Sequence, residues 1–502
     1  MTDPLEPLKR SAKALQKAYE ARDKNACLQV HSFVPATKTL KRADFLYVIA
    51  RQKNFESWPK LKAAVEARGL ARVEAQERLK IALFLGQRPI VDRLLADMPD
   101  LASDHFGLQI ALYDRAAVKA TLWSDPSLAT RLIGPRRPIL HLTFSRYHQM
   151  APEREADMLA IAKMLRDCGA DVNEAYPHQP GSDELLSALY GAVGHSGNMP
   201  LARWLLEHGA DPNDGESLYH ATELGHHEGL KLLLHHGATP RGTNALLRAM
   251  DFNDHKAVEM LLAAGADPNE DLTDHGFTAL HQAARRMCDG AMANLLLQAG
   301  ADRDRLWNGL TALSLARLHA NDAVSDALSE AGATAQTDPA LENIIAVVQG
   351  KPHTPIDPAK LPDAIGELLH HLITLPGSER QVERLVIAGW PWDGVDNYNM
   401  TPVQLAGWQG LPRMMRFFLR MKPDLGHVNG YGGTLLSTII HGSENAPSRE
   451  GQDHVGCLIL ALEEGVALPR PAIELAGRED VAEFLKDWAK RYPSQVVAHG
   501  IG

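Results

Sequence analysis

Residues 194–197, Gly-His-Ser-Gly, are the closest approach to a serine nucleophile that this chain offers. A serine hydrolase needs Gly-x-Ser-x-Gly on a strand-to-helix turn, because that turn exposes the serine hydroxyl. Here Asn198 stands in place of the second glycine, and the flanking residues are typical of a turn between helices. We therefore predict that Ser196 is not catalytic.

The sequence contains 23 histidines, and the imidazole of histidine is a common metal ligand. Three adjacent pairs stand out, at His226-His227, His235-His236 and His370-His371. Adjacent side chains on a helix point to different sides, so such a pair is a poor chelate by itself. The sequence contains no His-Glu-x-x-His. We predict no metal site.

Thiol and phosphate chemistry are equally poorly supported. The four cysteines, Cys27, Cys168, Cys288 and Cys457, are far apart and form no Cys-x-x-Cys pair. Cys168 stands near a helix C-terminus, which is the wrong end to stabilise a thiolate. No Gly-x-x-x-x-Gly-Lys loop is present. We expect no cofactor, and we expect that the chain is not an enzyme.

Composition narrows the class of partner. The chain has 502 residues, and 52 Lys and Arg stand against 62 Asp and Glu, which gives a formal charge of −10. A nucleic-acid binder needs a basic surface, so we expect no nucleic-acid partner. No apolar run approaches the roughly 20 residues that span a bilayer. We expect a cytoplasmic protein, monomeric, that binds no membrane.

One phrase recurs after apolar helical segments and organises the chain. Gly-Ala followed by Asp or Thr recurs six times, as in Leu205–Asn213 and Leu261–Asn269. Glycine can adopt the left-handed turn that ends a helix. Proline then prevents the helix from resuming. A shorter alanine-rich helix precedes each phrase, as in Thr278–Ala284, so the unit is a pair of helices.

These residues resemble ankyrin repeats, whose pattern is Thr-Pro-Leu-His-x-Ala-Ala, a Gly-His turn, a leucine-rich helix and Gly-Ala-Asp-x-Asn. The resemblance implies an all-α ankyrin-repeat solenoid of about ten helix-turn-helix units, several of them degenerate. It also implies structural hydrogen bonds for His226 and His281. The segment Ala43–Glu66 resembles a helical module that precedes repeats in many bacterial ankyrin proteins, which implies a bacterial source.

The expected organisation has four parts. Residues 1–70 form a small helical N-terminal module, residues 75–335 a first ankyrin stack, and residues 364–492 a second, degenerate stack. Five prolines between residues 336 and 363 mark a joint between the stacks. The stretch 176–182 is expected to be a loop.

The resemblance implies a non-enzymatic scaffold that binds a partner protein through the concave face of the array. The alternative is a regulatory or inhibitory subunit of a partner enzyme or toxin-like protein. Aromatic and arginine side chains anchor many interfaces. The predicted partner-binding residues are Asp251, Phe252, Asp274, His275, Phe277, Arg285, Arg286, Trp307, Leu310, His319, Tyr398 and Trp408.

Overall fold

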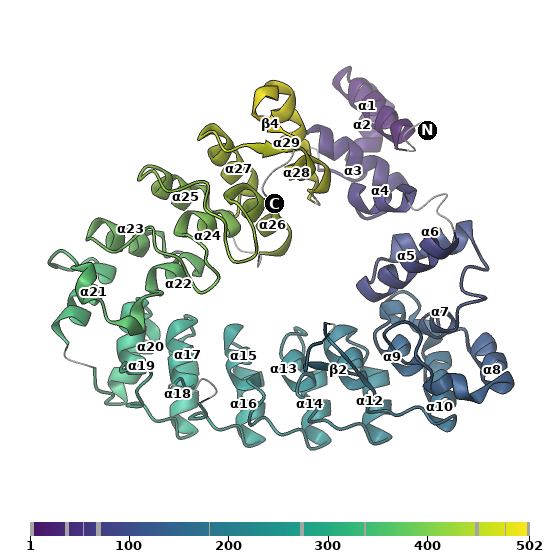
Figure 1. Ribbon diagram of the computed structural model, residues 1–502, viewed down its shortest axis with the longest axis horizontal. Coiled ribbons are helices and arrows are strands. Elements are labelled where there is room, and N and C mark those ends of the chain that lie inside the picture. Colours follow the sequence, from purple (N-terminus) through teal and green to yellow (C-terminus); the bar gives the residue numbers. More distant parts are fainter. Residues whose placement is uncertain are drawn as a thin grey trace. The chain divides into compact units, whose positions relative to one another are not determined.

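The structure is a computed structural model that describes residues 5–35, 40–53, 55–66, 72–179, 181–271, 276–335, 338–446, 451–476 and 478–498. Short α-helices make up most of this part of the chain (Figure 1). The chain divides into two compact units, Met1–Asp267 and Pro268–Gly502. The predicted all-α class is confirmed.

Unit 1 opens with four helices that have a hydrophobic core of their own. Their bounds are α1 (Glu6–Glu20), α2 (Lys24–His31), α3 (Arg42–Gln52) and α4 (Trp58–Glu66).

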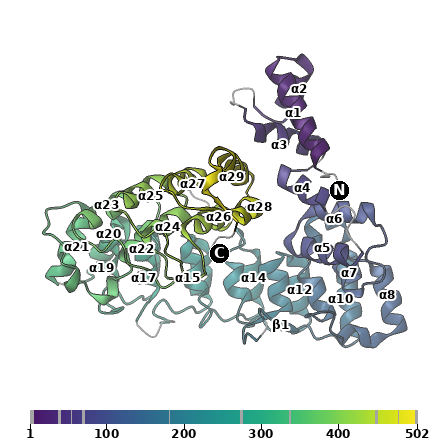
Figure 2. The same ribbon diagram turned by 45° about the horizontal axis from the view of Figure 1, so that its top comes forward.

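Helix pairs fill the rest of unit 1. The second helices α12 and α14 lie side by side in Figures 1 and 2, and the first helix α13 lies along one side of this row in Figure 1. The helices are α5 (Arg72–Leu85), α6 (Arg88–Asp97), α7 (Phe106–Ala111), α8 (Arg115–Ser124), α9 (Pro138–Thr143), α10 (Glu155–Asp167), α11 (Ala188–Tyr190), α12 (Met199–Glu207), α13 (Ser217–Ala221), α14 (Glu228–His235), α15 (Ala245–Asp251) and α16 (His255–Ala263). Short 3₁₀ turns are η1 (Pro126–Thr130), η2 (Arg146–Gln149) and η3 (Pro152–Arg154), and η4 (Gly191–His195) is a single π-helical turn.

A β-hairpin replaces part of the loop that we expected at 176–182. Strands β1 (Ala175–Pro177) and β2 (Leu185–Ser187) pair antiparallel, with Tyr176 opposite Leu186. Both of these side chains are buried, and the Tyr176 ring packs against Phe144 of the preceding segment, with centroids 5.2 Å apart.

Unit 2 repeats the helix-pair plan. Its helices are α17 (Ala279–Arg285), α18 (Gly290–Gln298), α19 (Ala312–Leu318), α20 (Asp322–Glu330), α21 (Pro339–Gln349), α22 (Leu368–Thr374), α23 (Glu379–Ile387), α24 (Pro402–Trp408), α25 (Pro412–Leu419), α26 (Leu435–Asn445), α27 (His454–Glu463), α28 (Arg470–Leu475) and α29 (Glu479–Arg491). The 3₁₀ turns η5 (Pro358–Lys360), η6 (Asp363–Ile365) and η7 (Pro493–Gln495) connect them, and β3 (Leu468–Pro469) pairs parallel with β4 (Val496–Val497).

The proline-rich segment 336–363 is not where the chain divides. One hydrophobic cluster runs from Leu310 to Trp488 and takes in Leu341, Ile344 and Val348 of α21. The division falls instead after Asp267. Prolines break helices, but they do not prevent the segment between them from packing into a core.

Glycines end the second helices as the sequence predicts. Gly209, Gly237 and Gly265 have φ of 97°, 91° and 94°, in the left-handed region that favours glycine. At Gly237 the next amide, Ala238 N–H, donates to Leu233 C=O at 3.0 Å and so satisfies a carbonyl at the helix end.

The asparagine of the recurring phrase links consecutive repeats. Asn173 Oδ1 accepts from the Asp211 amide at 2.7 Å, and its Nδ2 donates to Gly209 C=O at 3.1 Å. Asn213 likewise accepts from the Thr239 amide at 2.7 Å. The phrase therefore ends one helix and fixes the next repeat in register.

Candidate functional site

A continuous row of polar and aromatic side chains crosses the first helices of three consecutive repeats in unit 1. We call it the first-helix ladder, and its members are Tyr190, Glu216, Tyr219, His220, Glu223, Arg248, Asp251 and Phe252.

Repeat register places these residues on one face. Tyr190 and Tyr219 each follow a buried leucine, Leu189 and Leu218. His220 is two residues after Leu218, and Arg248 is the matching residue in α15. Each helical residue turns about 100°, so burying the leucines leaves these neighbours at the edge of the core.

The charged members of the ladder touch one another in sequence. Glu216 Oε2 lies 3.2 Å from His220 Nε2, and Glu223 Oε2 lies 2.8 Å from His220 Nδ1. The Arg248 guanidinium donates to Glu223 Oε1 from Nε at 2.7 Å and from Nη2 at 2.6 Å. Its Nη1 donates to Asp251 Oδ2 at 2.8 Å. Side chains from two first helices are thereby tied together.

Aromatic rings border this charged row. The Arg248 Cζ atom lies 5.5 Å from the centroid of the Tyr219 ring and 4.9 Å from that of Phe252. The Tyr190 ring centroid lies 4.9 Å from that of His220. Phe252 is 52% exposed, which is high for a phenylalanine. A guanidinium held between aromatic rings and carboxylates is a recognition arrangement as well as a structural one.

The electrostatics of the ladder are dominated by its carboxylates. Burial raises the pKa of Glu216, with His220 opposing that change and Glu184 adding to it. Burial also acts to raise the pKa of Glu223, but hydrogen bonds from His220 and Arg248 outweigh it, so that pKa is lowered. Burial raises the pKa of Tyr219, and nearby carboxylates add to the rise. The ladder contains three carboxylates, on Glu216, Glu223 and Asp251, and one guanidinium, on Arg248, so the carboxylates outnumber the guanidinium.

A second aromatic cluster in unit 1 is structural. The Arg136 guanidinium lies over the rings of Phe84, Phe144 and Tyr176, with Cζ to centroid distances of 4.9, 4.7 and 4.3 Å. The His195 ring packs on Phe84 at 4.0 Å, and burial lowers the pKa of His195 to about 4. These groups fill the core beside the π-helical turn.

Ser196, which we predicted not to be catalytic, is buried. Its exposed fraction is 1%, and its hydroxyl donates to Ala192 C=O at 3.2 Å. Where the structure describes the chain, no three His, Cys, Asp or Glu side chains gather as metal ligands.

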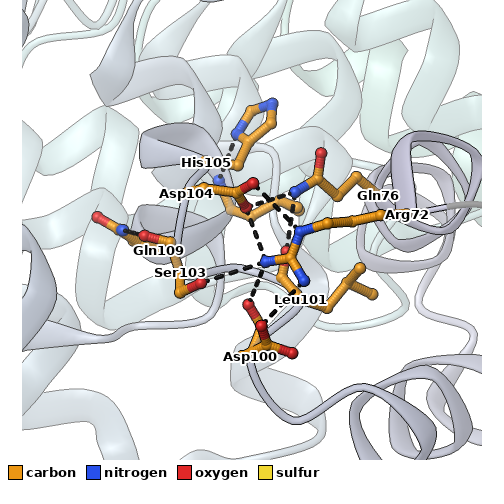
Figure 3. Close-up of polar contacts among 9 residues, drawn as sticks. Arg72, Gln76, Asp100, Leu101, Ser103, Asp104, His105 and Gln109 are labelled. Atoms are coloured by element: carbon orange, nitrogen blue, oxygen red, sulfur yellow. Dashed lines mark hydrogen bonds and ion pairs between the residues drawn. The ribbon is translucent and has the colours of Figure 1, made fainter.

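The polar cluster drawn in Figure 3 also has a structural role. Arg72 at the start of α5 donates to Asp100 at 3.0 Å, to Asp104 at 2.9 and 3.1 Å and to Ser103 at 3.2 Å. Gln76 donates to Asp104 at 2.8 Å. The cluster attaches the turn that follows α6 to the start of α5.

The predicted partner-binding residues separate by unit. Asp251 and Phe252 lie in the first-helix ladder of unit 1. Asp274 and His275 lie outside the described residues. The remaining eight residues belong to unit 2.

Three predicted surface residues are buried, which corrects their assignment. Phe277, Leu310 and His319 are 5%, 4% and 4% exposed. Phe277 packs edge-on against Trp307, with centroids 5.2 Å apart, and the His319 ring lies 5.0 Å from that of His371. The neighbouring repeat covers positions that the repeat pattern leaves open.

The other predicted residues of unit 2 do not gather into one cluster. Arg285 is half-buried, and its carbonyl accepts from His371 Nε2 at 3.0 Å, whereas Arg286 is exposed. Tyr398 is 59% exposed and stacks on Tyr431, with centroids 5.7 Å apart. Trp408 is half-buried.

Sequence reasoning missed Tyr190, Glu216, Tyr219, His220 and Arg248. Register could have found His220 and Arg248, since both stand two residues after the buried leucine. His281, in contrast, has the structural role that the resemblance implied. Its Nδ1 accepts from the Thr278 amide at 3.2 Å.

Helix pairs stacked through glycine-capped turns define a helical repeat protein. Residues 148–244 and 246–338 match the family described as "Ankyrin repeats (3 copies)". The chain is therefore an ankyrin repeat-containing protein, as its sequence pattern predicted. Ankyrin repeats are generally protein–protein interaction modules, and the family is typically non-enzymatic.

Two solved structures are similar to parts of the chain. An ankyrin repeat domain from Acinetobacter baumannii AYE is 25% identical and covers 37% of this chain and 99% of its own, with a TM-score of 0.30. The ankyrin repeat domain of human ASB11 is 20% identical and covers 48% of this chain and 96% of its own, with a TM-score of 0.25. No curated protein matches the chain. No helix in the described ranges is long and apolar enough to cross a membrane.

Proposed function

We propose that this chain is a non-enzymatic scaffold that binds a partner protein on the first-helix ladder of unit 1. The observation that carries the proposal is the continuity of the ladder across three repeats. The side chains of its ion-paired members are 13% to 28% exposed and are held by one another, while Phe252 at its end is 52% exposed.

The composition of the ladder supports an interface. Tyrosine and arginine dominate the binding energy of many interfaces, because they combine apolar area with directed hydrogen bonds. Here Arg248 and two carboxylates are already held by one another, so little side-chain entropy is lost when a partner docks. The proposed setting is the cytoplasm, in agreement with the free thiols of Cys27, Cys168 and Cys457.

Site-specific photo-crosslinking tests the location of the interface. A benzoylphenylalanine at position 252 should give a discrete adduct in the cells that produce the protein. The same residue at position 123 is the matched control, because Trp123 is 88% exposed and lies near the end of the second helix α8. Equal adducts at both positions, or adducts at position 123 alone, would show that the ladder is not the docking face.

A further inference from the structure

Most of the net charge of the chain belongs to the repeats that carry the ladder. Residues 171–267 contain fourteen Asp and Glu against five Lys and Arg, a formal charge of −9, although the whole chain carries −10. Two of these acidic residues, Asp183 and Glu184, are exposed and lie between the strands of the β1–β2 hairpin. A like-charged partner would be repelled here and a basic one attracted.

The contacts of Arg248 indicate which chemical group suits this face. Its guanidinium lies between the Tyr219 and Phe252 rings and donates to Glu223 and Asp251. The chain thus supplies one arginine to a site built from two rings and two carboxylates. This arrangement suits the flat, five-donor geometry of guanidinium better than the point charge of an ammonium.

The preceding rung of the ladder has the same kinds of groups but a weaker donor. There Tyr190 occupies the position of Tyr219, and His220 occupies the position of Arg248. The two imidazole nitrogens of His220 face Glu216 and Glu223, whereas the guanidinium of Arg248 carries five N–H donors. Glu223 is already compensated by Arg248.

Within the described part of the chain, Glu216 is paired with the imidazole of His220 and not with an arginine or lysine. Among the residues that the structure describes, no Lys or Arg lies within ion-pair distance of Glu216. The nearby charge of Glu184 adds to the local negative field. A half-buried carboxylate beside a tyrosine ring and a second carboxylate is a site for an incoming guanidinium.

We propose that the ladder docks an arginine-rich segment of a partner protein, one of whose guanidinium groups is bound by Glu216, Glu184 and the Tyr190 ring. This inference rests on the proposed function, because it names the chemistry of the partner on the same face. The segment's other basic side chains lie along the field of residues 171–267.

Fluorescein-labelled octa-arginine, measured by anisotropy against the full chain, is the probe. Wild type should bind it at low salt, octa-lysine more weakly and octa-glutamate not at all. Affinity should fall as salt shortens the Debye length from about 30 Å at 0.01 M to about 10 Å at 0.1 M.

Double Glu→Gln substitutions distinguish binding at Glu184 and Glu216 from a general effect of the negative charge. Glu184→Gln with Glu216→Gln should weaken octa-arginine binding at least about fivefold. The control is Glu207→Gln with Glu228→Gln, which removes the same charge from exposed positions on the second helices α12 and α14. This control should change the affinity for octa-arginine less than about twofold. If the double variant misfolds, Glu184→Gln alone can be tested, because it alters only an exposed residue of the hairpin. It should still weaken octa-arginine binding, but by less than the double variant.

Equal weakening by both pairs would overturn the proposed rung, because it would show a diffuse charge effect. Failure of wild type to bind octa-arginine, or tighter binding of octa-glutamate, would overturn the arginine-rich partner. Crosslinking at position 252 with no octa-arginine binding would leave the docking face in place and reject only its chemistry. Failure at position 252 would reject the face itself.

Discussion

Replacing His319 with glutamine is expected to flatten the pH dependence of stability in unit 2. His319 directly follows α19, and its Nδ1–H donates to Leu315 C=O at 2.8 Å. Burial lowers the pKa of His319 to about 4, the hydrogen bond to Leu315 opposes the change, and Arg285 adds to it. The folded unit therefore keeps the imidazole neutral at pH values where the unfolded chain protonates it.

The sign and size of the effect follow from proton linkage. The ordinary pKa is 6.5, so between pH 4 and 6.5 the unfolded chain binds one more proton. The free energy of unfolding then falls with falling pH by about 1.4 kcal/mol per unit. The titration of His319 does not change the free energy of unfolding above pH 6.5. Between pH 7 and pH 5 it lowers that free energy by about 2 kcal/mol.

Urea unfolding followed by circular dichroism, repeated between about pH 5 and pH 8, measures this slope. Glutamine keeps a hydrogen-bond donor but cannot titrate, so the variant should lose stability at pH 8 and regain it relative to wild type towards pH 5. His353→Gln removes an exposed histidine from the same unit and is the matched control. Parallel stability profiles for wild type and His319→Gln would refute the assignment of a buried neutral imidazole.

Three further substitutions test the repeat and the ladder by urea unfolding. Gly265→Val should lower the free energy of unfolding by about 1–3 kcal/mol through backbone strain alone, since no atom lies within 4 Å of the added Cβ; an unchanged midpoint would contradict the helix-end assignment. Asn213→Ala should cost about 1 kcal/mol by removing the acceptor of the Thr239 amide, and Asn213→Asp should retain most of the stability. Arg248→Gln should cost about 1–2 kcal/mol because two half-buried carboxylates lose their charged donor, whereas Arg203→Gln, at an exposed site on α12, should be nearly neutral.

The periodic parts of the fold could be predicted because their signals are local. Gly209 and Gly265 end helices for a reason that the backbone alone imposes, and their φ values confirm it. The bounds of helix α2 could not be predicted, because only Ala26 and Val30 are buried in it, too few to make an apolar stripe. The β1–β2 hairpin was missed because strands of three residues show no alternation.

Exposure at the candidate site could not be predicted, because it depends on contacts with residues far along the chain. His319 is covered by His371, and Phe277 by Trp307. Neither neighbour can be paired with its target from spacing, since the repeats between them vary in length. Phe252, in contrast, is 52% exposed, and its assignment to a partner-binding face stays a prediction.

One register position shows how this stack separates structure from recognition. Gln282 in α17 stands where Arg248 stands in α15, two residues after the buried leucine, yet Gln282 is 8% exposed. The leucines and glycines set the stack, so they have the same role in every repeat. The residue at this position is free to differ, and whether it faces solvent is decided by the adjacent repeat. A binding face can therefore form only where consecutive repeats leave this position open, as His220 and Arg248 do in unit 1.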